Sequence, residues 1–205
     1  MFAGSSIFAY LYNFECDAMI REILKNRILV IDGAMGTMIQ SYNLGEEDYR
    51  GSIFSHQPKQ LKGNNDLLSL TQPDIIREIH GKYLRAGADI IETNTFNANA
   101  ISQLDYGTER HCYDINKASA ELAKSACMEY SSTDKPRFVA GAIGPTNQTA
   151  SMSPNVEDPG YRRFYFDDFV KAYSEQASGL IDGGADLLLI ETVFDTLNCK
   201  AAIYA

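Results

Sequence analysis

The chain is poor in the residues that build disulfides and metal clusters. Its 205 residues include only three histidines, none of which has a histidine partner four residues away, and four cysteines. No cysteine belongs to a Cys-x-x-Cys pair, and this excludes a metal knuckle of closely spaced ligands. The cysteines are Cys16, Cys112, Cys127 and Cys199. Because isolated thiols are typical of reducing compartments, we expect a cytoplasmic protein.

Long apolar runs and positive charge are also scarce. No window approaches the roughly 20 apolar residues that a membrane span requires. The first 14 residues are fairly apolar but lack the basic segment with which a secretory signal begins, and this argues against such a signal. A formal net charge of -9 argues against binding nucleic acid or an anionic membrane through bulk electrostatics. A small polar ligand suits this composition better.

What the sequence does contain is a repeated pattern, GADIIET at residues 87–93 and GADLLLIET at residues 184–192. The glycine of each copy fits the end of a preceding helix, and the unbroken apolar run is typical of a parallel strand covered on both faces. Each copy therefore predicts a buried strand that ends in a carboxylate, Glu92 or Glu191. Because a buried carboxylate is costly without a partner, these two residues are the first candidates for contact with a cation or a polar substrate.

Strands and helices alternate along the chain, which predicts an α/β fold with a parallel sheet, either open or closed as a barrel. The four β/α units are half of the eight in a (β/α)₈ TIM barrel of about 250 residues. We therefore expect the truncated N-terminal half of a barrel at 17–205, lacking its C-terminal half, after an unassigned extension at 1–16. Strands are expected at 28–31, 88–92, 138–143 and 185–190, and helices at 17–26, 73–86, 114–130, 169–181 and from 196 onward.

Polar residues follow every expected strand, at the sheet edge where α/β proteins bind their ligands. Paired carboxylates suit an α-ammonium group, and backbone N–H groups at the start of a helix suit an α-carboxylate, so the edge could bind an amino acid. The same carboxylates could instead bind Mg²⁺, which prefers oxygen ligands. Asp32 could also serve only as a turn residue. The polar residues in question are Asp32, Glu92, Thr93, Asn94, Thr95, Thr146, Asn147, Glu191 and Thr192.

Two further features have structural interpretations. His80 lies in the expected helix at 73–86, and we expect it on the helix surface. The segment from Gly144 to Phe166 is longer than the 2 to 6 residues of an ordinary βα loop and contains three prolines. We expect this segment to be a lid or a docking surface.

Five motifs in order resemble the homocysteine-binding module at the N-terminus of cobalamin-dependent methionine synthase. The resemblance runs from about Ile28 to the end of the chain. The motifs are DGAMGTMIQ at 32–40, KGNND at 62–66, IETNTF at 91–96, GPTN at 144–147 and IETVFDTLN at 190–198.

The resemblance implies a (β/α)₈ barrel in which zinc activates the thiol of homocysteine and methylcobalamin donates a methyl group to give methionine. A metal-bound thiol is deprotonated, and the thiolate is the nucleophile. By the same resemblance, Asp32 and Glu191 hold the substrate ammonium group, and the backbone of Gly33 and Ala34 holds its carboxylate. The remaining pocket residues are Glu92, Thr93, Asn94 and Asn147.

The chain departs from this family in what it lacks. The three zinc cysteines lie in Asn-Cys and Gly-Gly-Cys-Cys-Gly motifs on later strands, and neither motif is present at a strand end here. Asn198-Cys199 lies in an expected helix. We therefore expect the zinc ligands, and the folate- and cobalamin-binding modules that are the partners of this domain, beyond Ala205. The 205 residues are expected to hold no catalytic residue, metal or cofactor, and to be inactive alone.

Three alternatives remain open. A homocysteine methyltransferase that uses betaine or S-methylmethionine is similar at Asp32, Gly33 and Glu191. A magnesium-dependent lyase would use Asp32, Glu92 and Glu191 as metal ligands. A half barrel without catalytic function would dimerise or bind a partner, because its open sheet edges would otherwise favour aggregation.

Overall fold

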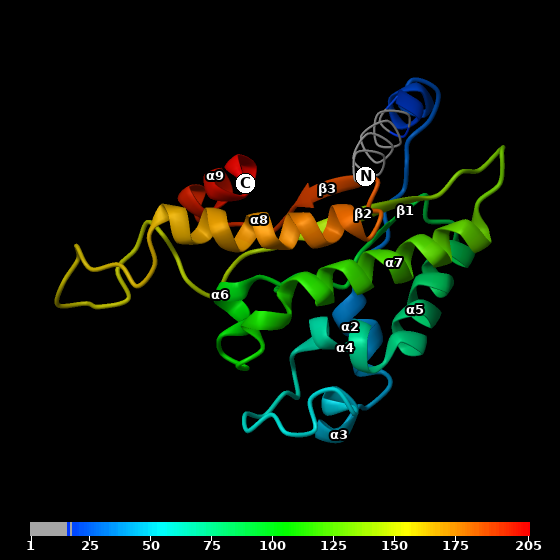
Figure 1. Ribbon diagram of the computed structural model, residues 1–205. Helices are drawn as coiled ribbons and strands as arrows, with labels where there is room; N and C mark the ends of the chain where they lie inside the picture. The colour runs from blue at the N-terminus through cyan, green and yellow to red at the C-terminus, as the bar shows by residue number, and fades with distance from the viewer. Residues whose placement is uncertain (1–15, 17) are drawn as a thin grey trace, which may run out of the picture.

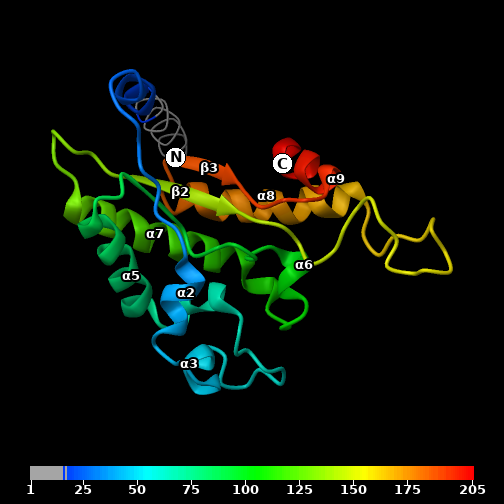
Figure 2. The same cartoon turned by 180° about the vertical axis from the view of Figure 1, so that it is seen from behind.

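The structure is a computed structural model that describes residue 16 and residues 18–205. The expected extension at 1–16 and the start of the first helix lie almost wholly outside these residues. Residues 18–24 are helical, as expected for this segment. Helices α7 (Cys112–Tyr130) and α8 (Phe166–Asp182) lie across one face of a small sheet (Figure 1), and the strands face the viewer from the other side (Figure 2).

Three parallel strands form the sheet, in the order β1 (Ile90–Glu92), β2 (Phe138–Ile143) and β3 (Leu187–Ile190). Every residue of the central strand β2 is buried, which confirms the strand expected at 138–143. The α/β prediction is therefore confirmed as an open parallel sheet. Completion of this sheet to a barrel remains a prediction.

The strand expected at 28–31 is reduced to a single bridge, in which Ile31 pairs in parallel with Ile90. The segment still runs beside β1, since the Asp32 N–H donates to the Ile90 carbonyl at 2.9 Å. The prediction of a full strand is wrong because a side chain replaces part of the ladder: the Val30 N–H donates to the Asp89 carboxylate at 2.9 Å.

The strand in the second GAD copy is also less covered than its sequence indicates. Only β2 is buried along its whole length, whereas β3 is partly exposed and Leu188 exposes 41% of its surface. The expectation of two strands covered on both faces is therefore wrong for β3. Within the described residues β3 pairs with β2 alone, which leaves its other edge open.

The longer helices follow the expected pattern, although α7 and α8 begin earlier than expected, at Cys112 and Phe166. Helix α5 (Pro73–Ala86) begins with Pro73 and ends at Gly87, whose φ of 116° is the left-handed conformation that favours glycine. Helix α9 (Thr196–Tyr204) begins where expected, and the Asp195 carboxylate accepts the N–H groups of Leu197 and Asn198. The short helices are α2 (Met35–Gln40), α3 (Glu46–Arg50), α4 (Leu68–Thr71) and α6 (Ala100–Gln103), and 3₁₀ turns span Asn65–Leu67 and Glu109–His111. None of the helices among the described residues is long and apolar enough to cross a membrane.

Two glycines allow α7 and α8 to pack closely. A Cβ on Gly179 would lie 2.7 Å from the Tyr113 carbonyl oxygen and 2.9 Å from the Asn116 Cβ, and one on Gly183 would meet the Lys117 carbonyl. The resulting interface continues into a core between the helices and the sheet that includes Ile91, Val139, Phe169, Tyr173 and Leu180. This core fixes the positions of the strand ends.

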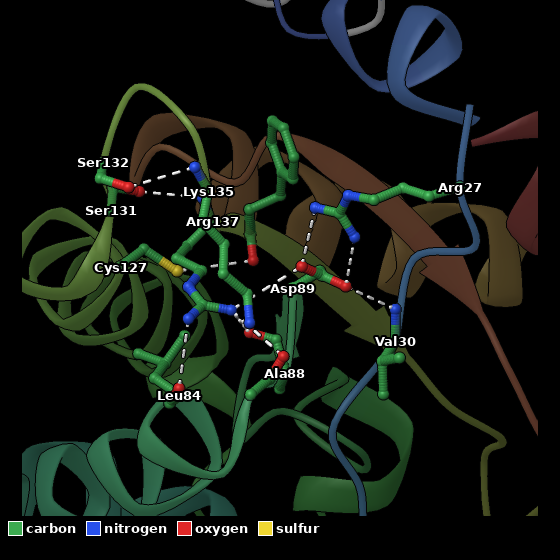
Figure 3. A network of polar contacts seen from close by, with 12 residues as sticks. Arg27, Val30, Leu84, Ala88, Asp89, Cys127, Ser131, Ser132, Lys135 and Arg137 are labelled. Atoms are coloured by element: carbon green, nitrogen blue, oxygen red, sulfur yellow. Dashed lines mark hydrogen bonds and ion pairs between the residues drawn. The ribbon is translucent and has the colours of Figure 1, made fainter. Parts of the chain in front are cut away.

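Each GAD aspartate joins two parallel segments at the start of its strand. Asp89 accepts the N–H of Val30 and two hydrogen bonds from Arg27, at 2.9 and 3.0 Å, and lies 3.8 Å from the Arg137 guanidinium (Figure 3). Arg27 and the Val30 N–H lower the pKa of Asp89 against the effect of burial. Asp186 repeats the arrangement, accepting the Val139 N–H at 2.8 Å and the Lys124 ammonium at 2.5 Å.

His80 lies in the core, contrary to the expected surface position. Its side chain is fully buried, and burial lowers its pKa to about 4. The buried positions of α5 are Ile76, Ile79, His80, Gly81 and Leu84. The inward face therefore includes the expected Ile79, with Ile75 and Tyr83 packed against the core from partly buried positions, and extends further to Ile76, His80 and Leu84.

Candidate functional site

A cavity of about 360 Å³ opens at the carboxyl ends of the strands. It brings together seven of the eight residues that the sequence singles out: Asp32, Gly33, Ala34, Glu92, Thr93, Asn94 and Glu191. The remaining lining residues are Met35, Gly36, Gly63, Asn64, Asn65, Asp66, Phe96, Asn97 and Tyr106. This set contains no lysine, arginine or histidine, so the charged groups that face the cavity are all carboxyl groups.

Asp32 is held at the rim by the neighbouring strand. Its backbone N–H donates to the Ile90 carbonyl, and its Oδ1 accepts the Glu92 N–H at 2.9 Å. These two bonds continue the parallel pairing past the Ile31–Ile90 bridge. Asp32 therefore both joins the first chain segment to β1 and lines the cavity.

The carboxyl groups of Asp32, Glu92 and Glu191 influence one another across the cavity. Burial, and then the nearby charges of Glu191 and Asp32 and a hydrogen bond with Glu191, raise the pKa of Glu92 to about 7. Burial also raises the pKa of Asp32 to about 7, against its hydrogen bond from the Glu92 N–H and with a smaller contribution from Glu191. An ammonium group in this cavity would therefore relieve repulsion between carboxylates.

Thr93 and Asn94 have structural partners in addition to their place in the wall. The Thr93 hydroxyl accepts the Ala142 N–H at 2.9 Å and lies 2.6 Å from the Thr95 hydroxyl. The Asn94 amide donates to the Asn65 carbonyl at 2.7 Å. These hydrogen bonds hold the chain that follows β1 in place. Thr93 and Asn94 therefore form a rigid part of the cavity wall.

The turn after Asp32 leaves its backbone accessible. Ala34 adopts the left-handed conformation with φ of 48° and precedes α2. A Cβ placed on Gly33 would meet no atom within 4 Å. The first N–H groups of a helix have no partner within it, so the N–H groups at this turn are available to a ligand.

Left-handed backbone recurs on the opposite side of the cavity. Thr192, directly after Glu191, has φ of 52°. This conformation is uncommon for a β-branched residue, and such strain is concentrated at functional sites. The Thr192 hydroxyl lies 3.4 Å from Glu191 Oε2.

Of the eight residues expected in the substrate pocket, Asn147 is the one that the structure does not place in the cavity lining. Its side chain is exposed and donates to Asp105 Oδ2 at 2.6 Å. The chain turns away before this residue because the Asn97 amide binds the Pro145 carbonyl at 2.9 Å and the Thr146 hydroxyl donates to the Gln148 carbonyl at 2.5 Å. The role of Asn147 in substrate binding remains a prediction.

The expected site residues omit one side of the cavity. Asn64, Asn65 and Asp66 lie in the KGNND motif, so the sequence did contain a signal for them. Tyr106 belongs to no motif, and only the tertiary structure brings it to the cavity.

The described residues do not form a metal site. No group of three or more histidine, cysteine, aspartate or glutamate side chains in residues 16 and 18–205 is arranged to hold a metal ion. This finding covers the candidate magnesium ligands Asp32, Glu92 and Glu191. It applies equally to zinc, since Cys112 and Cys127 are buried in α7 and Cys199 lies in α9.

The cavity lies within a segment that matches a known protein family. The sequence pattern of the family described as homocysteine S-methyltransferase matches residues 29–205, which is most of the chain. The chain belongs to this family. The match includes the elements that line the cavity, from Asp32 to Glu191.

Solved structures of the homocysteine methyltransferase MmuM from Escherichia coli share the fold. The oxidized form is 24% identical, with a TM-score of 0.67 over 89% of this chain and 59% of that one. The metallated form is 26% identical, with a TM-score of 0.65 over 89% of this chain and 60% of that one. The chain thus spans about three-fifths of the length of these structures.

Proposed function

We propose that this chain binds the amino-acid end of homocysteine as part of a homocysteine S-methyltransferase. The observation that carries the proposal is the single cavity in which Asp32, Glu92 and Glu191 converge with no basic residue in the lining. Family membership supports homocysteine as the amino acid. A cavity of about 360 Å³ is also within the usual range for small-molecule sites.

In this proposal, each end of the amino acid has its own partners. Asp32 and Glu191 bind the ammonium group, because opposite charges attract strongly where water is partly excluded. The accessible backbone at Gly33 and Ala34 binds the α-carboxylate. Glu92, Thr93 and Asn94 form the wall between them. The roles of these residues are to bind and orient the substrate.

The methyl donor and the metal belong to the same proposal. Methylcobalamin is favoured over a small methyl donor by the KGNND motif and by the long segment after Gly144. Zinc would lower the pKa of the homocysteine thiol so that it reacts as the thiolate, and the zinc ligands would lie outside the described residues, since these offer no suitable group. We assign to this chain substrate binding within a partial (β/α)₈ barrel in the cytoplasm, alongside folate- and cobalamin-binding modules, and no catalytic turnover by itself.

A calorimetric titration of the 205-residue chain tests the proposal. L-Homocysteine is expected to bind. The analogue 4-mercaptobutanoate, which lacks only the ammonium group, is expected to bind at least tenfold more weakly, because a lost ion pair with a buried partner costs more than 1.4 kcal/mol. Equal affinities, or no binding of L-homocysteine, would overturn the proposal.

A further inference from the structure

Asp66 is a buried carboxyl group at the edge of the cavity that the proposed function does not use. It exposes 5% of its surface. Its Oδ1 accepts the Asn97 N–H at 3.3 Å, and its Oδ2 accepts the Gln103 side-chain amide at 3.2 Å. Both donors are neutral. Burial raises the pKa of Asp66 to about 7, while the Asn97 N–H acts in the opposite direction.

The orientation of the Gln103 amide is fixed by its other contacts. Its Oε1 accepts the Asn64 amide at 2.7 Å and the Thr108 hydroxyl at 2.6 Å. Its Nε2 also donates to the Asn97 carbonyl at 3.2 Å. Reversal of the amide would break these bonds, so Gln103 presents a donor to residue 66. Residue 66 therefore faces two donors, the Asn97 N–H and the Gln103 amide. A carboxylate offers a separate oxygen to each donor, whereas an asparagine side chain has only one oxygen.

The segment that Asp66 holds forms a wall of the cavity. Asn94, Phe96 and Asn97 all line it. On the far side, the Asn97 side chain binds the Pro145 carbonyl, and the Phe96 carbonyl lies so close to Gly144 that a Cβ there would collide with it. Residues 94–97 are therefore held between the end of β2 and the 3₁₀ turn that contains Asp66.

We infer that Asp66 is a positioning residue that fixes residues 94–97 as the cavity wall and thereby sets the affinity of the cavity for its amino acid. The identity of that amino acid rests on the proposed function, whereas the fixing of the wall does not. The inference explains why a carboxyl group is buried beside the cavity, where a hydrophobic residue would avoid the cost of desolvation.

Asp66→Asn tests the inference, with Asp89→Asn as the matched control. Asp89 also accepts a backbone N–H through a buried carboxylate, but it lies at the opposite end of β1. Both variants are measured at pH 8, where the Asp66 carboxyl group is ionised. The readouts are the dissociation constant of L-homocysteine from calorimetry and the hydrogen-exchange rate of the Asn97 amide from NMR. Circular dichroism of each variant establishes that it is folded.

Asp66→Asn is expected to weaken binding about tenfold, because one buried donor then loses its acceptor, and to speed exchange at Asn97. Asp89→Asn is expected to change neither. Unchanged affinity in Asp66→Asn, or an equal loss in Asp89→Asn, would overturn the inference. If wild-type protein binds no L-homocysteine, the proposed function fails, and exchange at Asn97 alone decides whether Asp66 fixes the wall.

Discussion

The side chain of Asp32 accepts the backbone N–H of Glu92 at 2.9 Å, so one carboxylate of the cavity fixes the residue that carries another. This bond continues the pairing between the first chain segment and β1 beyond the last backbone bridge. It also keeps two acidic side chains close together in a partly buried place. The cost of that proximity is expected to appear in the pH dependence of both binding and stability.

Binding of an amino acid is expected to strengthen as the pH rises from 6 to 8. The pKa values of Asp32 and Glu92 are both raised to about 7, so both groups become ionised in this range and then attract an ammonium group. We expect an increase on the order of tenfold for L-methionine, since one pKa unit corresponds to a tenfold change. L-Methionine has no thiol to titrate, and calorimetry at each pH measures its affinity. A constant or falling affinity would contradict this assignment of the carboxyl groups.

Glu92→Gln is expected to stabilise the free protein more at pH 8 than at pH 5. A carboxyl group whose pKa is raised on folding binds its proton more tightly in the folded state, so its contribution to stability is lost as the pH rises from about 4.5 through about 7. After allowance for solvent screening, we expect about 1 kcal/mol, or a rise in Tm of about 2–4 °C at pH 8. Thermal unfolding at both pH values measures the effect. A larger stabilisation at pH 5 would contradict a pKa of Glu92 raised by burial and by its neighbouring carboxylates.

Gly179→Ala is expected to lower the free energy of unfolding by about 1–3 kcal/mol, the usual cost of overpacking. The added methyl group would lie 2.7 Å from the Tyr113 carbonyl oxygen and force α7 and α8 apart. Gly33→Ala is the control, because a Cβ there meets no atom within 4 Å and should change stability by less than about 0.5 kcal/mol. Urea unfolding measures both variants. Equal stability of the two would mean that the helices have room to adjust.

The repeated GAD pattern explains why much of the site could be predicted. The glycine, the apolar run and the glutamate are all local features, and the parallel topology brings the carboxyl ends of the strands to one edge. Asp32, Glu92 and Glu191 consequently line the same cavity, as the sequence leads one to expect. The roles of these residues in substrate binding remain predictions.

The remaining features depend on tertiary contacts that no local pattern encodes. Asp66 reaches the cavity through a buried network with Asn97 and Gln103. Asn147 leaves it because Asp105 offers a partner outside. The strand at 28–31 is shortened because the Asp89 side chain takes a backbone N–H that a full ladder would use. In each case a side chain distant in the sequence competes with the regular structure that the local pattern favours.

The most direct test of the central claim is the affinity of Glu191→Gln for L-homocysteine, measured by calorimetry at pH 8 beside wild type. Glu121→Gln, on the exposed face of α7, serves as a control of equal charge change. The account predicts that Glu191→Gln loses about 2–5 kcal/mol of binding free energy, the range for truncating one partner of a buried charge pair, and that Glu121→Gln binds like wild type. Unchanged affinity in Glu191→Gln would contradict the account, because the ammonium group would then lie elsewhere.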